Sequence, residues 1–181
     1  MTSFHQLKSP HQVHFDSVDS LIDSKIDPTA TLAGGVQIMG DVAIGPYSQV
    51  SPDVLLDNST IEAEVEIKPR TKVKDSRIGS QTYVGPNSEI IFTQIGSGNY
   101  LDQRVTTGSE DLNASITKIG DNTDIAQGTN VAAGANIGDS VRIGAKASIG
   151  TDATVTNGAV VNYKEVIPNK AVRIAKDQKL V

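Results

Sequence analysis

The fold is decided by residues 119–150, which read IGDNTDIAQGTNVAAGANIGDSVRIGAKASIG. An aliphatic residue recurs here at every sixth position, and a small or β-branched residue such as Thr123 or Ala135 follows four positions later. A strand alternates with a period of two, so a six-residue period indicates a short strand followed by a turn. We interpret each hexapeptide as one strand and one corner of a three-sided prism, with three hexapeptides in each coil. The sequence therefore predicts an all-β protein, a parallel β-helix.

The same period continues towards both ends of the chain, from Ile26 to Ile167. Beyond Ile119 a coil has 18 residues, whereas the coils between Ile44 and Ile95 have 17 because their third rung has five residues. At a strand spacing of roughly 4.8 Å, about eight coils would form a prism about 35–40 Å long. We expect the aliphatic and the small positions to point inward. The Gly that often follows the aliphatic residue is expected to supply unusual backbone angles at the corner.

This pattern divides the chain into a solenoid and two flanking segments. The solenoid is predicted over residues 26–172, with an inserted loop near 107–118 at the third rung of one coil. An open solenoid exposes unpaired backbone groups at both ends. Residues 1–25 and 173–181 are therefore predicted to form an N-terminal and a C-terminal cap.

The composition narrows the classes of protein. Aromatic residues make up only 4% of the chain and Trp is absent, which fits a thin solenoid better than a wide core. The net charge of −5 argues against a nucleic-acid partner, and the absence of Cys excludes disulfides and thiolate sites. No run of 18 apolar residues exists, and the polar start is not typical of a signal peptide. We expect a cytoplasmic protein without a membrane partner.

The repeats over residues 26–175 resemble the hexapeptide-repeat transferases, whose fold is a left-handed β-helix. The short rungs before Ile-Gly, as in residues 74–79, and the ending at residues 166–176 are similar to the C-terminal domain of N-acetylglucosamine-1-phosphate uridyltransferases and related sugar nucleotidyltransferases. The resemblance implies a left hand, a homotrimer and acyl-CoA in the groove between adjacent prisms. It places the cofactor along small residues of the late coils, with one basic residue holding the CoA. These residues are Ala126, Ala132, Ala133, Gly134, Ala145, Ala147 and Lys176. The alternative is that small residues stand there because turns require them.

The set of catalytic residues expected for acetyl transfer is incomplete in this sequence. Acetyl transfer in this superfamily usually uses His as the general base, yet no His follows His14. On the alignment implied by the resemblance, Gln103 occupies the place of the catalytic His, and Gln cannot accept a proton at neutral pH. The acceptor-sugar motif Asn-Tyr-Asp-Gly is also missing. Glu110 and Asp111 in the insertion are candidates for a replacement base, although such an insertion can also be only a surface loop.

A metal site is not expected. A carbonic anhydrase of this fold needs three His ligands, but His5, His11 and His14 all precede the repeats and no carboxylate has a clear spacing to them. The sequence therefore argues against a metal-dependent carbonic anhydrase.

Two functions remain. The first is an acyl-CoA-dependent acyltransferase that acts on a sugar or a nucleotide sugar. The second is a catalytically silent trimeric scaffold or regulatory subunit that lacks the catalytic His and serves a partner protein.

Overall fold

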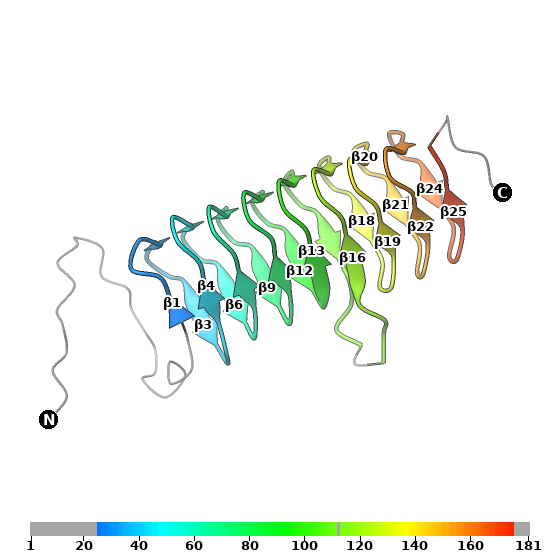
Figure 1. The fold of residues 1–181 in the computed structure, drawn as a ribbon. Coiled ribbons are helices and arrows are strands. Elements are labelled where there is room, and N and C mark those ends of the chain that lie inside the picture. The colour runs from blue at the N-terminus through cyan, green and yellow to red at the C-terminus, as the bar shows by residue number, and fades with distance from the viewer. Residues whose placement is uncertain (1–24, 112, 176–181) are drawn as a thin grey trace, which may run out of the picture.

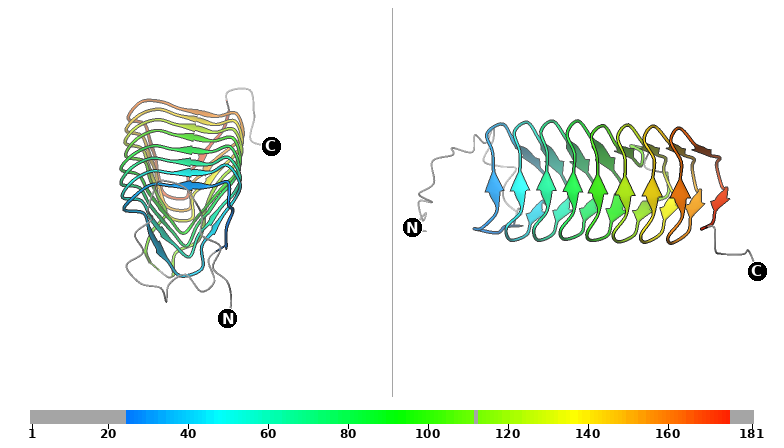
Figure 2. Two further views of the ribbon diagram at one scale, coloured as in Figure 1. Left: turned by 90° about the vertical axis from the view of Figure 1, so that its left-hand side faces the viewer. Right: turned by 90° about the horizontal axis from the view of Figure 1, so that it is seen from above.

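The computed structural model describes residues 25–111 and 113–175, and these form a parallel β-solenoid with three flat faces (Figure 1). One nine-stranded and two eight-stranded parallel sheets run along its length, which we name sheets A, B and C in chain order. Seen along its axis, the chain encloses a narrow interior (Figure 2). The prediction of an all-β parallel helix of about eight coils is confirmed.

Every strand is short, and each sheet takes one strand from each coil. Sheet A contains β1 (Lys25–Ile26), β4 (Ala43–Ile44), β7 (Thr60–Ile61), β10 (Arg77–Ile78), β13 (Thr93–Ile95), β16 (Thr117–Ile119), β19 (Asn136–Ile137), β22 (Thr154–Val155) and β25 (Val172–Arg173). Sheet B contains β2 (Thr31–Leu32), β5 (Gln49–Val50), β8 (Glu66–Ile67), β11 (Tyr83–Val84), β14 (Tyr100–Leu101), β17 (Asp124–Ile125), β20 (Arg142–Ile143) and β23 (Val160–Val161). Sheet C contains β3 (Gln37–Met39), β6 (Leu55–Asp57), β9 (Lys72–Lys74), β12 (Glu89–Ile91), β15 (Thr106–Thr107), β18 (Asn130–Val131), β21 (Ser148–Ile149) and β24 (Val166–Ile167).

The strands stack in register, which places like residues above one another. Ile78 pairs with Ile61 on one side and with Ile95 on the other. The aliphatic columns form one continuous core, and the small position of each corner, such as Ser48 or Ala135, is buried beside it. This confirms the predicted inward positions. Because apolar burial is the main driving force of folding, the core aliphatic residues carry most of the stability.

Three kinds of corner connect the sheets. We call them AB corners (for example residues 79–82), BC corners (102–105) and CA corners (132–135), after the sheets that they join. The 17-residue coils are shortened at their CA corner, where Phe92 alone connects β12 to β13. The predicted insertion leaves the solenoid at a CA corner as well, between β15 and β16.

The expected role of the repeated glycines is wrong. Gly79 and its equivalents do not have a left-handed backbone, which occurs two residues later, at positions such as Gln81 and Lys146. Gly79 is instead needed because the next coil passes very close. A Cβ atom on Gly79 would lie 2.5 Å from the carbonyl carbon and oxygen of Gly96. The sequence pattern was right, but its cause is packing between coils.

The predicted caps fall largely outside the described residues, which exclude 1–24, 112 and 176–181. Lys25 lies in β1 and Arg173 lies in β25, at opposite ends of the solenoid (Figure 1).

Candidate functional site

The inserted segment, residues 108–116, is the main departure from the repeat, and we call it the CA loop. It leaves sheet C after Thr107, re-enters sheet A at Thr117, and projects from the prism (Figure 1). Gly108 begins it with a left-handed backbone (φ 78°), and a Cβ atom there would overlap the carbonyl oxygen of Ile91 at 1.7 Å. The loop therefore starts tight against the preceding coil.

The first part of the CA loop folds back over earlier coils. Glu110 accepts a hydrogen bond from Lys72 Nζ at 2.5 Å, and Lys72 also pairs with Glu89 at 3.2 Å. A small hollow of about 230 Å³ lies beneath, lined by Phe92, Ser109 and Asp111 among others. The hydrogen bond from Lys72 lowers the pKa of Glu110. Glu110 is thus held as a carboxylate that is a weak base at neutral pH.

Asp111 is engaged within the loop itself. Its carboxylate accepts hydrogen bonds from the backbone N–H of Asn113 at 2.9 Å and from Asn113 Nδ2 at 3.2 Å. Its own backbone N–H donates to Ser109 Oγ at 3.0 Å. These contacts are typical of an Asx turn.

Gln103 lies elsewhere, at a BC corner. Its Nε2 donates to Gln127 Oε1 at 3.0 Å, one coil further along. The structure therefore does not bring Gln103 together with Glu110 and Asp111, which lie at the CA edge. The sequence analysis did not identify Gln127 as the partner of Gln103. The repeat could have done so, because Gln127 occupies the position of Gln103 in the next coil.

The predicted cofactor residues divide between two edges. Ala132, Ala133 and Gly134 occupy a CA corner, whereas Ala126 and Ala145 lie at BC corners. All five are half-buried. Ala147 also lies at a BC corner, but it is 1% exposed and belongs to the core. Lys176 lies outside the described residues.

The CA corner at residues 132–135 has an incomplete hydrogen-bond ladder. At most corners the left-handed residue donates its N–H to the preceding coil, as Lys146 does to Gln127 and Asp152 to Ala133. The N–H of Gly134 donates to none of the described residues, because the CA loop replaces the preceding corner. A Cβ atom on Gly134 would lie 3.1 Å from Ser115 Cβ, so the end of the loop lies directly against this corner.

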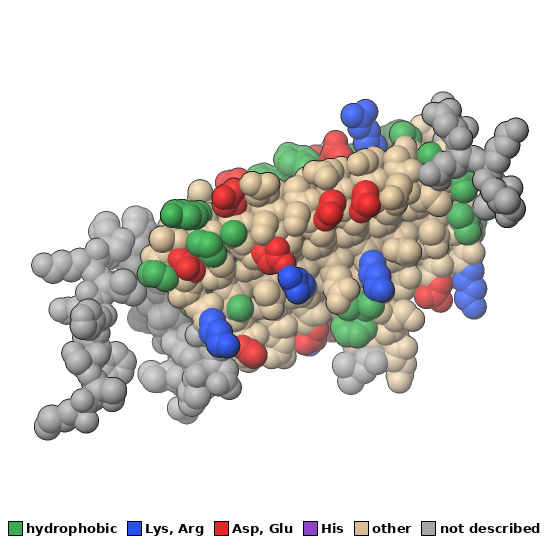
Figure 3. All heavy atoms as spheres, in the orientation of Figure 1, with side chains coloured by type: hydrophobic (Ala, Val, Ile, Leu, Met, Phe, Trp, Pro, Cys, Tyr) green, Lys and Arg blue, Asp and Glu red, His purple; other side chains and the backbone are tan. Residues whose placement is uncertain are grey.

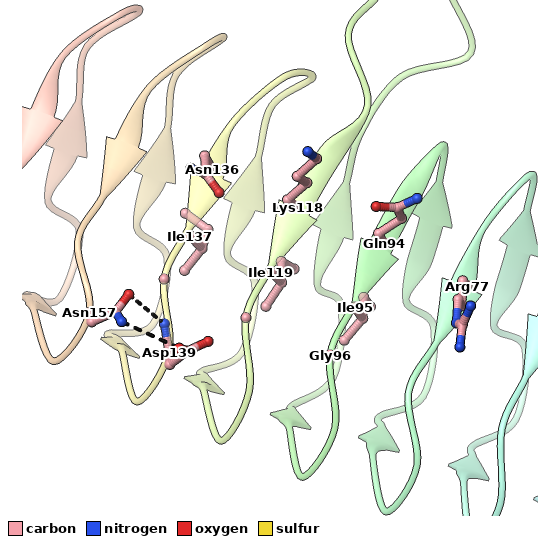
Figure 4. A pocket seen from close by; sticks show the side chains of 12 residues that line it. Arg77, Gln94, Ile95, Gly96, Lys118, Ile119, Asn136, Ile137, Asp139 and Asn157 are labelled. Atoms are coloured by element: carbon pink, nitrogen blue, oxygen red, sulfur yellow. Dashed lines mark hydrogen bonds between the residues drawn. The ribbon is translucent and has the colours of Figure 1, made fainter.

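A second hollow is a shallow groove of about 560 Å³ along sheet A and the AB corners (Figure 4). Side chains from four successive strands, Arg77, Gln94, Lys118 and Asn136, line one side of it. Asn157 Oδ1 accepts the backbone N–H of Asp139 on the other side, at 3.0 Å. Sequence reasoning missed this groove, although the column Gly96, Gly120 and Gly138 along its floor marks it.

Two further findings limit the chemistry. In residues 25–111 and 113–175, no three His, Asp or Glu side chains are grouped so that they could hold a metal ion. The three histidines considered as ligands fall outside that part of the chain. Across the same residues, no helix has the length and apolar character needed to cross a membrane.

Solved structures share this architecture, although no protein-family model and no curated protein sequence matches the chain. The UDP-N-acetylglucosamine O-acyltransferase from Moraxella catarrhalis superposes with a TM-score of 0.50 at 15% identity. The match covers 84% of this chain and 65% of that enzyme, so the chain spans just under two thirds of the enzyme's length. The UDP-N-acetylglucosamine acyltransferase from Bacteroides fragilis gives a TM-score of 0.49 at 19% identity, covering 81% of this chain and 68% of that enzyme. The chain therefore has the hexapeptide-repeat β-solenoid fold that the Moraxella acyltransferase also has.

Proposed function

We propose that this protein is an acyl-CoA-dependent acyltransferase of the hexapeptide-repeat class, with a sugar or nucleotide sugar as its acceptor. The shared fold with a UDP-N-acetylglucosamine O-acyltransferase supports the class. The observation that carries the proposal is the N–H of Gly134, which has no acceptor among residues 25–111 and 113–175 and lies at a small-residue corner beside the CA loop.

This corner suits the pantetheine arm of CoA. The arm is a thin chain with amide carbonyls, and it needs backbone donors together with side chains small enough to allow close approach. Ala132 and Ala133 supply the small side chains, and the N–H of Gly134, which has no acceptor among the described residues, supplies a donor. The proposal thus favours the CA edge over the BC edge that carries Ala126 and Ala145.

The CA loop would bring the acceptor to the thioester. A hydroxyl or amine must lose a proton as it attacks the acyl carbon, and Glu110 and Asp111 are the carboxylates that the CA loop carries. Because Lys72 lowers the pKa of Glu110, proton removal would be inefficient. Rate acceleration would then come mainly from holding the two substrates together, and we expect slow turnover.

We also propose that the protein is a homotrimer and works in the cytoplasm. A single prism offers only one wall for a cofactor at its edge, so a second copy alongside the CA edge would supply the other.

A catalytically silent scaffold is the second candidate. Its specific support is the ion pair that occupies Glu110, together with the absence of His from residues 25–111 and 113–175. In that case the same prism would bind a partner protein and transfer nothing.

Calorimetric titration with acetyl-CoA and succinyl-CoA tests the proposal. Ala133→Leu should abolish binding by filling the CA corner. Ala63→Leu, at the equivalent position of an AB corner, is the matched control and should bind normally. Loss of binding with Ala145→Leu and not with Ala133→Leu would move the cofactor to the BC edge. If neither thioester binds the unaltered protein, the acyltransferase proposal fails and a pull-down for a partner protein becomes the next experiment.

A further inference from the structure

One edge of the prism carries an unusual set of residues at its left-handed positions. L side chains rarely adopt this backbone, and Gly and Asn adopt it most readily. On the BC edge, four of these positions hold Arg70, Arg104, Lys146 and Lys164, which we call the basic ridge. On the AB and CA edges of the described solenoid, Lys170 is the only Arg or Lys at a left-handed position.

The basic ridge is a straight row of exposed cations. Arg70, Arg104 and Lys146 follow one another at intervals of two coils, about 10 Å, and Lys164 lies one coil beyond. All four side chains are exposed, and none forms an ion pair within the described residues.

The two acidic residues of the same corners are half-buried and have partners of their own. Asp102 accepts the backbone N–H of Gln103 at 2.7 Å, and Glu165 pairs with Arg173 at 3.2 Å. At the BC corners between β8 and β24, the exposed charged residues are thus the four cations of the ridge, although the whole chain is acidic.

An apolar tip adjoins the last member of the ridge. Val160 on β23, Tyr163 at the corner and Val166 on β24 are 48%, 58% and 66% exposed, and they belong to the coil whose BC corner carries Lys164. Lys164 Nζ lies 5.0 Å from the centre of the Tyr163 ring. One coil earlier, the outward positions of sheets B and C hold Arg142 and Ser148, so the apolar character is confined to the final coil. The face shown in Figure 3 differs, with single acidic and basic side chains scattered over it and no row of cations.

We propose that the basic ridge and the apolar tip bind the surface of an anionic lipid bilayer. Arg and Lys in a row are attracted to anionic headgroups, and a Tyr flanked by aliphatic side chains suits the boundary between headgroups and acyl chains. A soluble linear polyanion would also pair with the ridge, but it would leave Val160, Tyr163 and Val166 in water. The prism would lie with its BC edge on the membrane and its C-terminal coil inserted deepest.

This proposal is independent of the acyltransferase proposal, since it uses a different edge of the prism. It revises the expectation, drawn from overall charge and the lack of a long apolar run, that the protein has no membrane partner.

Vesicle flotation tests the proposal on the full chain. The protein should float with vesicles of equal parts phosphatidylcholine and phosphatidylglycerol, and not with phosphatidylcholine alone. The triple variant Arg104→Asn, Lys146→Asn, Lys164→Asn should weaken binding about a hundredfold, from about fivefold for each cation lost. Asn tolerates the left-handed backbone, so this variant should remain folded. The control variant Lys25→Gln, Lys118→Gln, Lys170→Asn removes the same charge from other surfaces and should bind as the parent does.

Tyr163→Ser examines the apolar tip separately. It should reduce vesicle binding several-fold even at high salt, where the ionic attraction is screened. Equal loss of binding in the two triple variants would reduce the effect to overall charge and overturn the proposal. Absence of vesicle binding would overturn the proposal as well. If the protein then bound immobilised polyphosphate through the basic ridge, the ligand would be a soluble polyanion instead.

Discussion

The carboxylate of Glu62 joins two coils through both of its oxygens. Oε1 accepts from Arg77 Nε at 2.8 Å, and Oε2 accepts from the Ser80 backbone N–H at 3.1 Å and from Ser80 Oγ at 2.9 Å. The hydrogen bond from Arg77 is the largest cause that lowers the pKa of Glu62, and those from Ser80 add to it. A side chain of this kind stabilises the fold only while it is ionised.

A pH dependence of stability follows. Because the pKa is lower in the folded state, the contribution of Glu62 is present above its unfolded value near 4.3 and is lost as the pH falls through the folded value. Glu62→Gln should reduce the free energy of unfolding by about 1 kcal/mol at pH 7, since Arg77 is largely exposed to screening solvent. Urea unfolding at pH 7 and pH 3 should show a smaller difference for this variant than for the parent. Glu64→Gln is the control, because the Glu64 carboxylate accepts, among the described residues, only from the Gln81 side chain at 3.0 Å.

The left-handed cations store strain that a substitution can release. Lys146 has a φ of 59°, and Asn at that position should raise stability by about 1 kcal/mol. A thermal melt should show an increase in Tm of about 2–4 °C. Arg142→Asn, on strand β20, relieves no such strain and should give no gain. A Tm that falls for Lys146→Asn would contradict the argument.

At the scale of the corner, two glycines should respond differently to Ala. Gly79 faces the backbone of Gly96 at 2.5 Å, so Gly79→Ala should cost about 2–3 kcal/mol through overpacking. Gly158 has a φ of 71° and open space where its Cβ would be, so Gly158→Ala should cost only about 1 kcal/mol. Chemical denaturation of the two variants measures this difference. Equal losses would mean that the close approach of the Gly96 backbone adds no overpacking cost at Gly79.

The strands and corners were predictable because the aliphatic residues that point inward recur at every sixth position. Ile61, Ile78 and Ile95 stack as their spacing predicts. The reason for the glycines was not predictable, because the sequence does not show how closely two coils approach. Strain at Arg104 or Lys146 was hidden for the same reason, since the repeat marks the corner but not the backbone angle of each residue in it.

The candidate site was predicted only in part. The small residues from Ala126 to Ala147 were treated as one groove, but each six-residue step carries the chain to the next edge, so they divide between the BC and CA edges. The sequence predicts an insertion at the third rung, and the chain leaves the repeat between β15 and β16. The ion pair between the loop and Lys72 depends on contacts between coils that no linear pattern shows. The same holds for the N–H of Gly134, which has no acceptor in the described part of the chain.

For the whole molecule, the CA loop should be dispensable for folding. Deleting residues 110–116 and changing Ser109 to Asn would leave a 17-residue coil like the one that Phe92 closes. The lost ion pair between Glu110 and Lys72 is exposed and contributes little. Circular dichroism should show a single cooperative melt with a Tm close to that of the parent, while binding of acetyl-CoA should be lost. Separate melting of the coils on either side of the deletion would show that the loop holds the two halves together.

Because the coils stack in register, the length of the prism can change only by whole coils. Excising residues 138–155 would join Ile137 to Thr156 in the same register and remove one complete turn. Every landmark beyond the cut would then move about 4.8 Å closer to the CA loop without changing its side of the prism. Duplicating the same segment would move them away by an equal step. The distance between a loop and a distant edge can therefore be set in whole increments, by evolution or by design, while the chemistry at each end stays the same.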